Sequence, residues 1–274
     1  MKLNKILLAG VMSAASALAA QAAELSLASG SVAGSLAAQA TVNGETVSFD
    51  AVLDDLSGAG FVLGAGASDA SRALTPAGSV SQLWSAAASL DTTLDPASAA
   101  FSAGSAGALS AHADGQFEGS LEAASLWLEA ELAIVSAEEA VGTPVRVDVA
   151  GSAESLWASS GPTLELVPTF DLVVRDAGAN VLGSWQGLDA GGSESFSFSF
   201  QSLVGEVLSF SLSHDSQAMG GAAAMAAGAG HTLDNAAWFE GTITVTAVPE
   251  PESYALFLAG LTAIGLFGRR RLQR

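Results

Sequence analysis

The sequence predicts a mainly β protein: an antiparallel β-sandwich of jelly-roll type with one helix at each end of the chain. Two observations predict the sandwich. Polar and apolar residues alternate along many short stretches, and Gly, Asp and Asn separate those stretches as turns. A third observation predicts the two helices, because apolar runs without this alternation lie in residues 1–22 and 249–274. The residues between them, 23–248, are expected to form one domain.

The first element is predicted to be a secretory signal peptide at residues 1–22. Lys2 and Lys5 make its start basic, residues 6–20 are apolar, and the small residues Ala20 and Ala22 favour cleavage after Ala22. A permanent N-terminal anchor helix is the alternative, which the Ala, Ser and Gly content of the run disfavours. We therefore expect the chain to be exported and signal peptidase to remove this segment.

The N-terminal part of the body contains a hairpin signal. An Asn-Gly pair at 43–44 separates two alternating stretches, residues 40–42 and 46–49, and this pattern favours a type I′ turn. Residues 58–78 and 219–230 are instead rich in Ala and Gly without clear alternation. Both of these segments are expected to be surface loops.

Residues 121–135 fit both a strand and a helix. Leu126, Leu128 and Leu132 share the parity of one strand face, whereas the Ala and Glu content and the length of the segment favour a helix. The strands predicted around it favour a long strand. Those strands are residues 145–149, 170–175, 193–200, 207–212 and 242–246, with turns at 176–178, 189–192 and Gly205.

The body of the protein is strongly acidic. The whole chain has a formal net charge of −19, but six of its nine basic residues lie in the two end segments. Residues 23–248 keep Arg72, Arg146 and Arg175, no lysine, and 26 of the 28 acidic residues, so their formal charge is near −23. Such a surface excludes nucleic acid as a partner, because nucleic acid is bound chiefly through Lys and Arg. With no cysteine in the chain, the core must stabilise the body without disulfides.

Motifs of catalysis are missing from the sequence. His112, His214 and His231 do not form a His-Glu-x-x-His spacing, and neighbours such as His214 and Asp215 face opposite ways on a strand. The chain also lacks a Gly-x-Ser-x-Gly elbow. We therefore expect the protein not to be an enzyme. A glycoside-active enzyme that uses two carboxylates is the less favoured alternative.

No cofactor is expected, with structural calcium as the alternative. Asp54-Asp55 and the pair Asp91 and Asp95 are the densest acidic clusters, but no Asp-x-Asp-x-Asp-Gly loop accompanies them. These carboxylates are therefore expected to lie in solvated loops.

Three Leu-Trp pairs recur along the body, at unequal spacings that do not make a repeat. Their tryptophans, Trp84, Trp127 and Trp157, are expected to be core or rim aromatics. The alternative is a carbohydrate-stacking face, which requires exposed aromatic rings aligned along one sheet.

The end of the chain has three parts. Pro249-Glu250-Pro251 interrupts strand pairing, because proline donates no backbone hydrogen bond. Residues 254–268 form an apolar run that falls short of the roughly 20 residues that span a bilayer comfortably. Arg269, Arg270 and Arg271 follow and favour the cytoplasmic side. Together these parts predict one marginal transmembrane helix with the body outside the membrane.

These three parts, in this order, resemble the PEP-CTERM sorting signal of Gram-negative bacteria, a tail that has also been labelled an ice-binding-protein C-terminal domain. The resemblance covers residues 249–274. It implies that an exosortase, a membrane enzyme, cuts near Pro249, Glu250 and Pro251 after a transient stay in the inner membrane. The body would then pass to the cell surface or to an extracellular polysaccharide matrix. On this basis we expect a non-catalytic structural or adhesive protein, with a carbohydrate-binding module as the alternative.

Overall fold

The computed structural model describes residues 23–58, 61–73, 78–113, 115–159, 164–188, 192–225, 230–248, 259–260 and 262. The predicted signal peptide lies outside these residues, as does nearly all of the predicted tail helix. No helix within the described residues is long and apolar enough to cross a membrane. The described body consists of strands: β1 (Glu24–Val42), β2 (Glu45–Gly58), β3 (Phe61–Ala73), β4 (Gly78–Asp95), β5 (Ser98–Ala113), β6 (Gly115–Val135), β7 (Pro144–Ser159), β8 (Leu164–Arg175), β9 (Val181–Leu188), β10 (Gly192–Leu203), β11 (Val207–Met225) and β12 (Gly230–Ala247).

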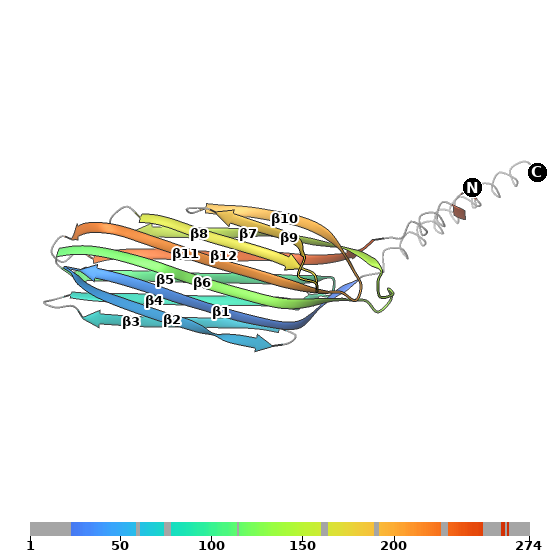
Figure 1. Cartoon of the computed structure of the whole chain (residues 1–274), viewed down its shortest axis with the longest axis horizontal. Helices are drawn as coiled ribbons and strands as arrows, with labels where there is room; N and C mark the ends of the chain where they lie inside the picture. The colour runs from blue at the N-terminus through green and yellow to red at the C-terminus, as the bar shows by residue number, and fades with distance from the viewer. Residues whose placement is uncertain are drawn as a thin grey trace, which may run out of the picture.

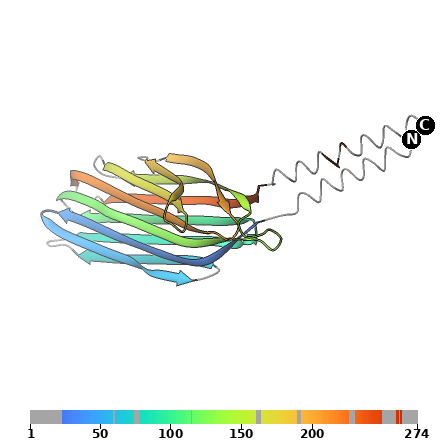
Figure 2. The same cartoon turned by 45° about the vertical axis from the view of Figure 1, so that its right-hand side comes forward.

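The strands form two antiparallel sheets of six strands each. Sheet A has the order β2-β1-β6-β11-β8-β9, and sheet B has the order β10-β7-β12-β5-β4-β3. The strands of both sheets run along the long axis of the body (Figures 1 and 2). The prediction of a mainly β, antiparallel sandwich is confirmed.

The last eight strands have the connectivity of a jelly roll. Strand β5 pairs with β12, β6 with β11, β7 with β10, and β8 with β9, so the pairs are nested one inside the next. The four N-terminal strands widen this unit. Strands β4 and β3 continue sheet B beyond β5, and β1 and β2 continue sheet A beyond β6.

Several local predictions are confirmed. Asn43 and Gly44 have positive φ values of 52° and 84°, as a type I′ turn requires, and they join β1 to β2. The ambiguous residues 121–135 are a strand, the second part of β6. Gly205 (φ 94°) lies in the turn between β10 and β11.

The prediction of loops at 58–78 and 219–230 is wrong for most of both segments. Residues 61–73 form β3, which pairs with β4 along its whole length, and residues 219–225 belong to β11. Ala and Gly have low strand propensity, but pairing with a neighbouring strand outweighs that preference. That neighbour cannot be recognised from the local composition.

Aromatic side chains form a contacting cluster in the core between the sheets. Phe239 is 1% exposed and meets Phe170 at a ring-centroid distance of 4.8 Å, edge to face. Trp185 stacks on Phe196 at 4.8 Å, and Phe101 meets Phe210 at 5.1 Å. Each fully buried ring of this kind contributes about 1.5–3 kcal/mol through the water-exposed area that it loses.

Two glycines of sheet B make room for these rings. A Cβ added to Gly241 would lie 2.5 Å from Cζ of Phe101, and one added to Gly151 would lie 2.7 Å from Cζ of Phe196. Gly151 and Gly241 are direct partners across β7 and β12. The inner face of sheet B is therefore bare of side chains where the phenylalanines approach it.

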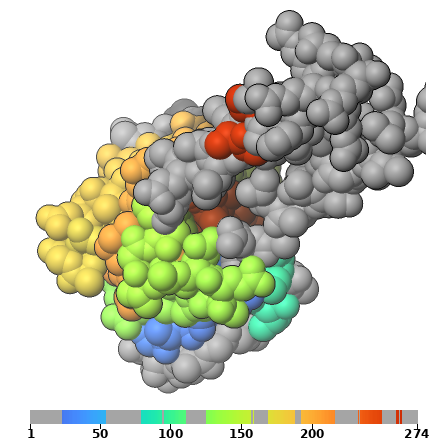
Figure 3. Space-filling view, turned by 90° about the vertical axis from the view of Figure 1, so that its right-hand side faces the viewer, coloured from blue at the N-terminus to red at the C-terminus, as the bar shows by residue number. Residues whose placement is uncertain are grey.

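The start of β1 and the end of β12 lie at the same end of the sandwich. The backbone N–H of Leu25 donates to the Pro96 carbonyl (2.7 Å), and that of Val245 donates to the Ala97 carbonyl (2.8 Å). We call this the tail end, because the tail follows β12. Figure 3 looks onto it, with the loop 136–143 (green) near its centre. The opposite, far end carries the turn at 43–44, and the 19 residues of β1 between the two ends span about 60 Å.

Candidate functional site

The residues predicted for sorting and processing lie outside the described residues: Pro249, Glu250, Pro251, Arg269, Arg270, Arg271, Ala20 and Ala22. Their predicted roles stay predictions. The structure does describe the residue just before them. The backbone N–H of Val248 donates to the Pro144 carbonyl at 3.1 Å, so hydrogen bonding to the sandwich continues up to the residue that precedes Pro249.

The three predicted tryptophans do not line one face. Trp84 is 1% exposed and lies in the core, whereas Trp127 is 40% exposed on the outer face of sheet A. The side chain of Trp157 lies outside the described ones. For Trp84 the core interpretation is therefore confirmed, and a sugar-stacking role for its ring is excluded by burial.

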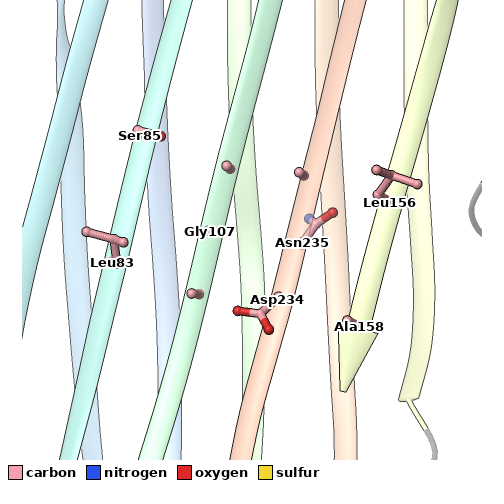
Figure 4. Close-up of a pocket in the computed structure, with 10 residues that line it drawn as sticks. Leu83, Ser85, Gly107, Leu156, Ala158, Asp234 and Asn235 are labelled. Atoms are coloured by element: carbon pink, nitrogen blue, oxygen red, sulfur yellow. The ribbon is translucent and has the colours of Figure 1, made fainter. Parts of the chain in front are cut away.

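A hollow of about 470 Å³ lies on the outer face of sheet B. Leu83 on β4 (56% exposed) and Leu156 on β7 (51% exposed) stand on its two sides, as Figure 4 shows. The strands between them, β5 and β12, carry only small side chains at the centre of its floor. Those residues are Ala106, Ala108 and Ala236. The hollow exists because alanines on β5 and β12 separate one leucine on β4 from one leucine on β7.

A second hollow continues the first along β5 and β12. It shares Ser85, Ala106 and Ala236 with the first, and Trp238 lies at its other side. Trp238 is partly exposed and lies against Gly104, where an added Cβ would come within 3.1 Å of the Trp238 Cβ. We call the two hollows together the sheet B trough. It follows the four residue steps from Asp234 to Trp238, about 14 Å.

Carboxylates, and no described cation, accompany the trough. Asp234 is exposed and lines it, and Glu154 lies directly opposite Trp238 across β7 and β12. The two arginines with described side chains act elsewhere. Arg146 pairs with Asp148 at 2.8 Å, and Arg175 donates to the Ala179 carbonyl at 3.4 Å. The trough therefore combines an apolar floor, one indole and hydrogen-bond acceptors of negative charge.

Sequence reasoning missed Trp238. The sequence contains a weak pattern that indicates its exposure: Asp234, Ala236 and Trp238 alternate with the buried Ala237 and Phe239. That alternation places Trp238 on the solvent face of β12. The trough itself could not be found this way, since its residues come from the hairpin of β4 and β5 together with β7 and β12, which lie far from it in the sequence.

His214 is buried between the sheets. It is 3% exposed, its Nδ1 lies 3.4 Å from Oγ of Ser105, and its ring lies 4.8 Å from that of Phe170. Burial lowers the pKa of His214 to about 4. Its Nε2 has no hydrogen-bond partner among the described residues. Because Ser105 is buried too, this serine–histidine contact lies in the interior between the two sheets.

His214 and Asp215 face opposite ways, as predicted. Asp215 points to the outer face of sheet A, where burial and the charge of Asp171 raise its carboxyl pKa. These two carboxylates are close, but neither lines a hollow described above. The carboxylate-enzyme alternative therefore stays a prediction, with Asp171 and Asp215 as one pair of neighbouring carboxylates in the described part of the chain.

The acidic pair considered for calcium lies in the last residues of β4, where the pairing with β5 shifts register, and not in a loop as predicted. Oδ1 of Asp91 accepts hydrogen bonds from the backbone N–H and the hydroxyl of Thr93, both at 2.7 Å, and these bonds lower the Asp91 pKa. Oδ1 of Asp95 accepts from the Ala97 N–H at 3.0 Å. The side chains of Asp54 and Asp55 lie outside the described ones. In the described part of the chain, no three His, Cys, Asp or Glu residues are grouped so that they could hold a metal ion.

Comparison with known proteins identifies the end of the chain. Residues 247–271 match the family model of the PEP-CTERM protein-sorting motif. That span includes Pro249, Glu250 and Pro251 as well as Arg269, Arg270 and Arg271. No curated protein sequence matches the chain.

Solved structures resemble the body only weakly. They include TmCBM61 in complex with β-1,4-galactotriose, at 13% identity over 48% of this chain and 71% of that one, with a TM-score of 0.25. The enzymatically active domain of bacteriophage CBA120 tailspike protein 4 matches at 9% identity over 69% of this chain and 19% of that one, with a TM-score of 0.20. Infectious bursal disease virus, Gx strain, matches at 12% identity over 94% and 76%, with a TM-score of 0.18. No function follows from TM-scores this low.

Proposed function

Because its PEP-CTERM sorting motif makes this chain an exported exosortase substrate, we propose that its body has a non-catalytic structural or adhesive role at the cell surface or in the extracellular matrix. The observation that carries this proposal is the motif itself, at residues 247–271. In the proposal, a signal peptide at residues 1–22 directs export, and the segment 254–268 holds the precursor in the inner membrane. Exosortase then cuts near Pro249, Glu250 and Pro251.

The geometry of the body supports a passive role. The Ser105–His214 contact is buried between the sheets, and the carboxylates of Asp91 and Asp95 at the end of β4 accept local hydrogen bonds from Thr93 and Ala97. Cleavage after Val248 would leave all of β12 in place, since this strand ends at Ala247, and it would keep the hydrogen bond from Val248 to Pro144. The processed body would therefore keep every strand.

Substitution of Pro249, Glu250 and Pro251 by alanine tests the sorting role. We expect the full-length protein to accumulate in the inner membrane, because the enzyme that removes the tail no longer recognises it. The measurement is immunoblotting of membrane and released fractions. A matched control is the triple alanine variant of Ser195, Ser197 and Ser199, which are exposed on β10. Unchanged release of a tail-less form by the first variant would contradict the proposal.

Carbohydrate binding is the second candidate, and the sheet B trough favours it. The trough places a partly exposed indole beside an apolar floor and two carboxylates, a combination that suits the mixed apolar and hydroxylated surface of a sugar. A glycan-array screen of the full-length protein in detergent tests this candidate. Failure to bind any glycan would leave the structural role alone.

A further inference from the structure

We infer that the sheet B trough binds a glycan chain that is neutral or carries amino groups, and that it rejects anionic polysaccharides. This inference rests on the proposed carbohydrate-binding role and adds the site and the chemical class of the ligand. Neither follows from the sorting motif.

The shape of the trough suits an extended chain with flat apolar patches. Leu83 and Leu156 border it on opposite sides, and the alanines of β5 and β12 leave its floor low. Pyranose rings present C–H groups on their faces, and such faces stack on indole rings and alkyl side chains. Trp238 supplies the indole in line with the floor.

The polar groups at the trough match sugar hydroxyls. Asp234 lines the trough, and Glu154 lies opposite Trp238 on the neighbouring strand. Ionised carboxylates only accept hydrogen bonds, and sugar hydroxyls donate them. Hydrogen bonds to a charged acceptor are stronger than those between neutral groups. These two side chains would orient a sugar that the apolar floor alone could not orient.

Charge decides which glycans fit. A uronate or sulfated polymer would bring its own negative charges beside Asp234 and Glu154, on a body whose formal charge is near −23. No described arginine lines the trough to offset this repulsion. The same repulsion argues against a second copy of the chain as the occupant, because two copies face to face would bring these carboxylates together. An amino-bearing glycan would gain attraction instead.

The position of the trough keeps it accessible. Trp238 lies nine residues before the end of β12, about 30 Å from the tail end, and Asp234 lies farther still. In a chain held at the membrane by its tail, the trough would lie about 30 Å along the sandwich from the point where the tail begins. Binding needs no prior release of the body.

The test measures binding of the full-length protein in detergent to three polysaccharide probes by affinity electrophoresis and calorimetry. The probes are a neutral β-glucan, chitosan and alginate. We expect binding to the first two and none to alginate at low salt. Trp238→Ala should weaken binding about tenfold, since aromatic stacking contributes up to about 1.5 kcal/mol beyond buried area. Ala106→Phe, which fills the floor, should abolish it.

Control variants distinguish failure of the proposed binding site from failure of the proposed carbohydrate-binding role. Trp127→Ala removes an exposed indole from the other sheet and should leave binding unchanged. Circular dichroism establishes that each variant is folded. Binding that survives Ala106→Phe and Trp238→Ala but is lost in Trp127→Ala would overturn the site while the carbohydrate role stands. Equal binding of alginate would overturn the charge argument. No binding to any probe would overturn the inference and the carbohydrate role, but not the sorting role. A dimer that Ala106→Phe dissociates would assign the trough to a second copy.

Discussion

Mild acidification should destabilise the sandwich through protonation of one buried side chain, that of His214. In the folded protein burial lowers its pKa from the ordinary 6.5 to about 4, whereas in the unfolded chain it titrates normally. The unfolded state therefore takes up a proton first as the pH falls. The contribution of the neutral His214 ring to the free energy of unfolding is therefore complete above pH 6.5 and is lost as the pH falls from 6.5 to 4.

The size of the loss follows from the shift. One pKa unit corresponds to 1.36 kcal/mol, so the full effect is about 3 kcal/mol, of which about 2 kcal/mol has developed at pH 5. The neighbours of His214 do not titrate in this range. Leu126 and Phe170 flank it in sheet A, and Ser105 contacts it from sheet B. Asp215 acts in the opposite direction, because its raised pKa makes protonation favour the folded state at lower pH.

The assay is equilibrium urea unfolding at pH 7.5 and pH 5, followed by tryptophan fluorescence. The wild-type protein should lose about 2 kcal/mol between the two, and His214→Leu should lose much less, since it has no proton to gain there. A variant in which glutamine replaces both His112 and His231 should keep the full loss. Equal losses in the wild type and in His214→Leu would refute the reasoning.

Two further substitutions test the aromatic core, both by urea unfolding at pH 7.5. Phe239→Ala should lower the free energy of unfolding by about 3–5 kcal/mol, because the ring is 1% exposed and meets Phe170 and Trp185. Phe239→Leu should lower it by less. A loss below 1 kcal/mol in the alanine variant would show that the cluster is loosely packed. Gly241→Ala should cost about 1–3 kcal/mol, since the new Cβ meets Cζ of Phe101 at 2.5 Å and the Ala150 carbonyl at 2.6 Å. Gly44→Ala is the control, because nothing lies within 4 Å of its new Cβ and only backbone strain remains. Equal losses of stability in Gly241→Ala and Gly44→Ala would argue against the close approach of Phe101.

The parts of the fold that the sequence predicts are those with a strong local pattern. Ser and Phe alternate along β10, and Asn43-Gly44 fits a hairpin turn, so both could be recognised without knowledge of the partner strands. Strand β3 could not be recognised, because its Ala and Gly residues take strand geometry only in register with β4. The same composition in residues 219–225 belongs to β11 for the same reason.

The candidate sites also differ in whether a local sequence pattern predicts them. The sorting motif is a contiguous signal, and its prediction from Pro249-Glu250-Pro251 and the arginines is confirmed by the family match. The trough depends on the register among β4, β5, β12 and β7, which brings Leu83 and Leu156 to opposite sides of Ala106 and Ala236. No spacing within the sequence reports that register.

The position of β12 has a mechanical consequence. Through its end the sandwich is joined to the tail, and β12 lies in sheet B between β5 and β7, hydrogen-bonded to both. When a ligand held away from the membrane pulls against the tail, the load runs along the strand. It is then shared by two ladders of hydrogen bonds at once, instead of opening them one after another. In the proposed sorting route, β12 would therefore resist tension between the body and the tail until exosortase cuts the tail.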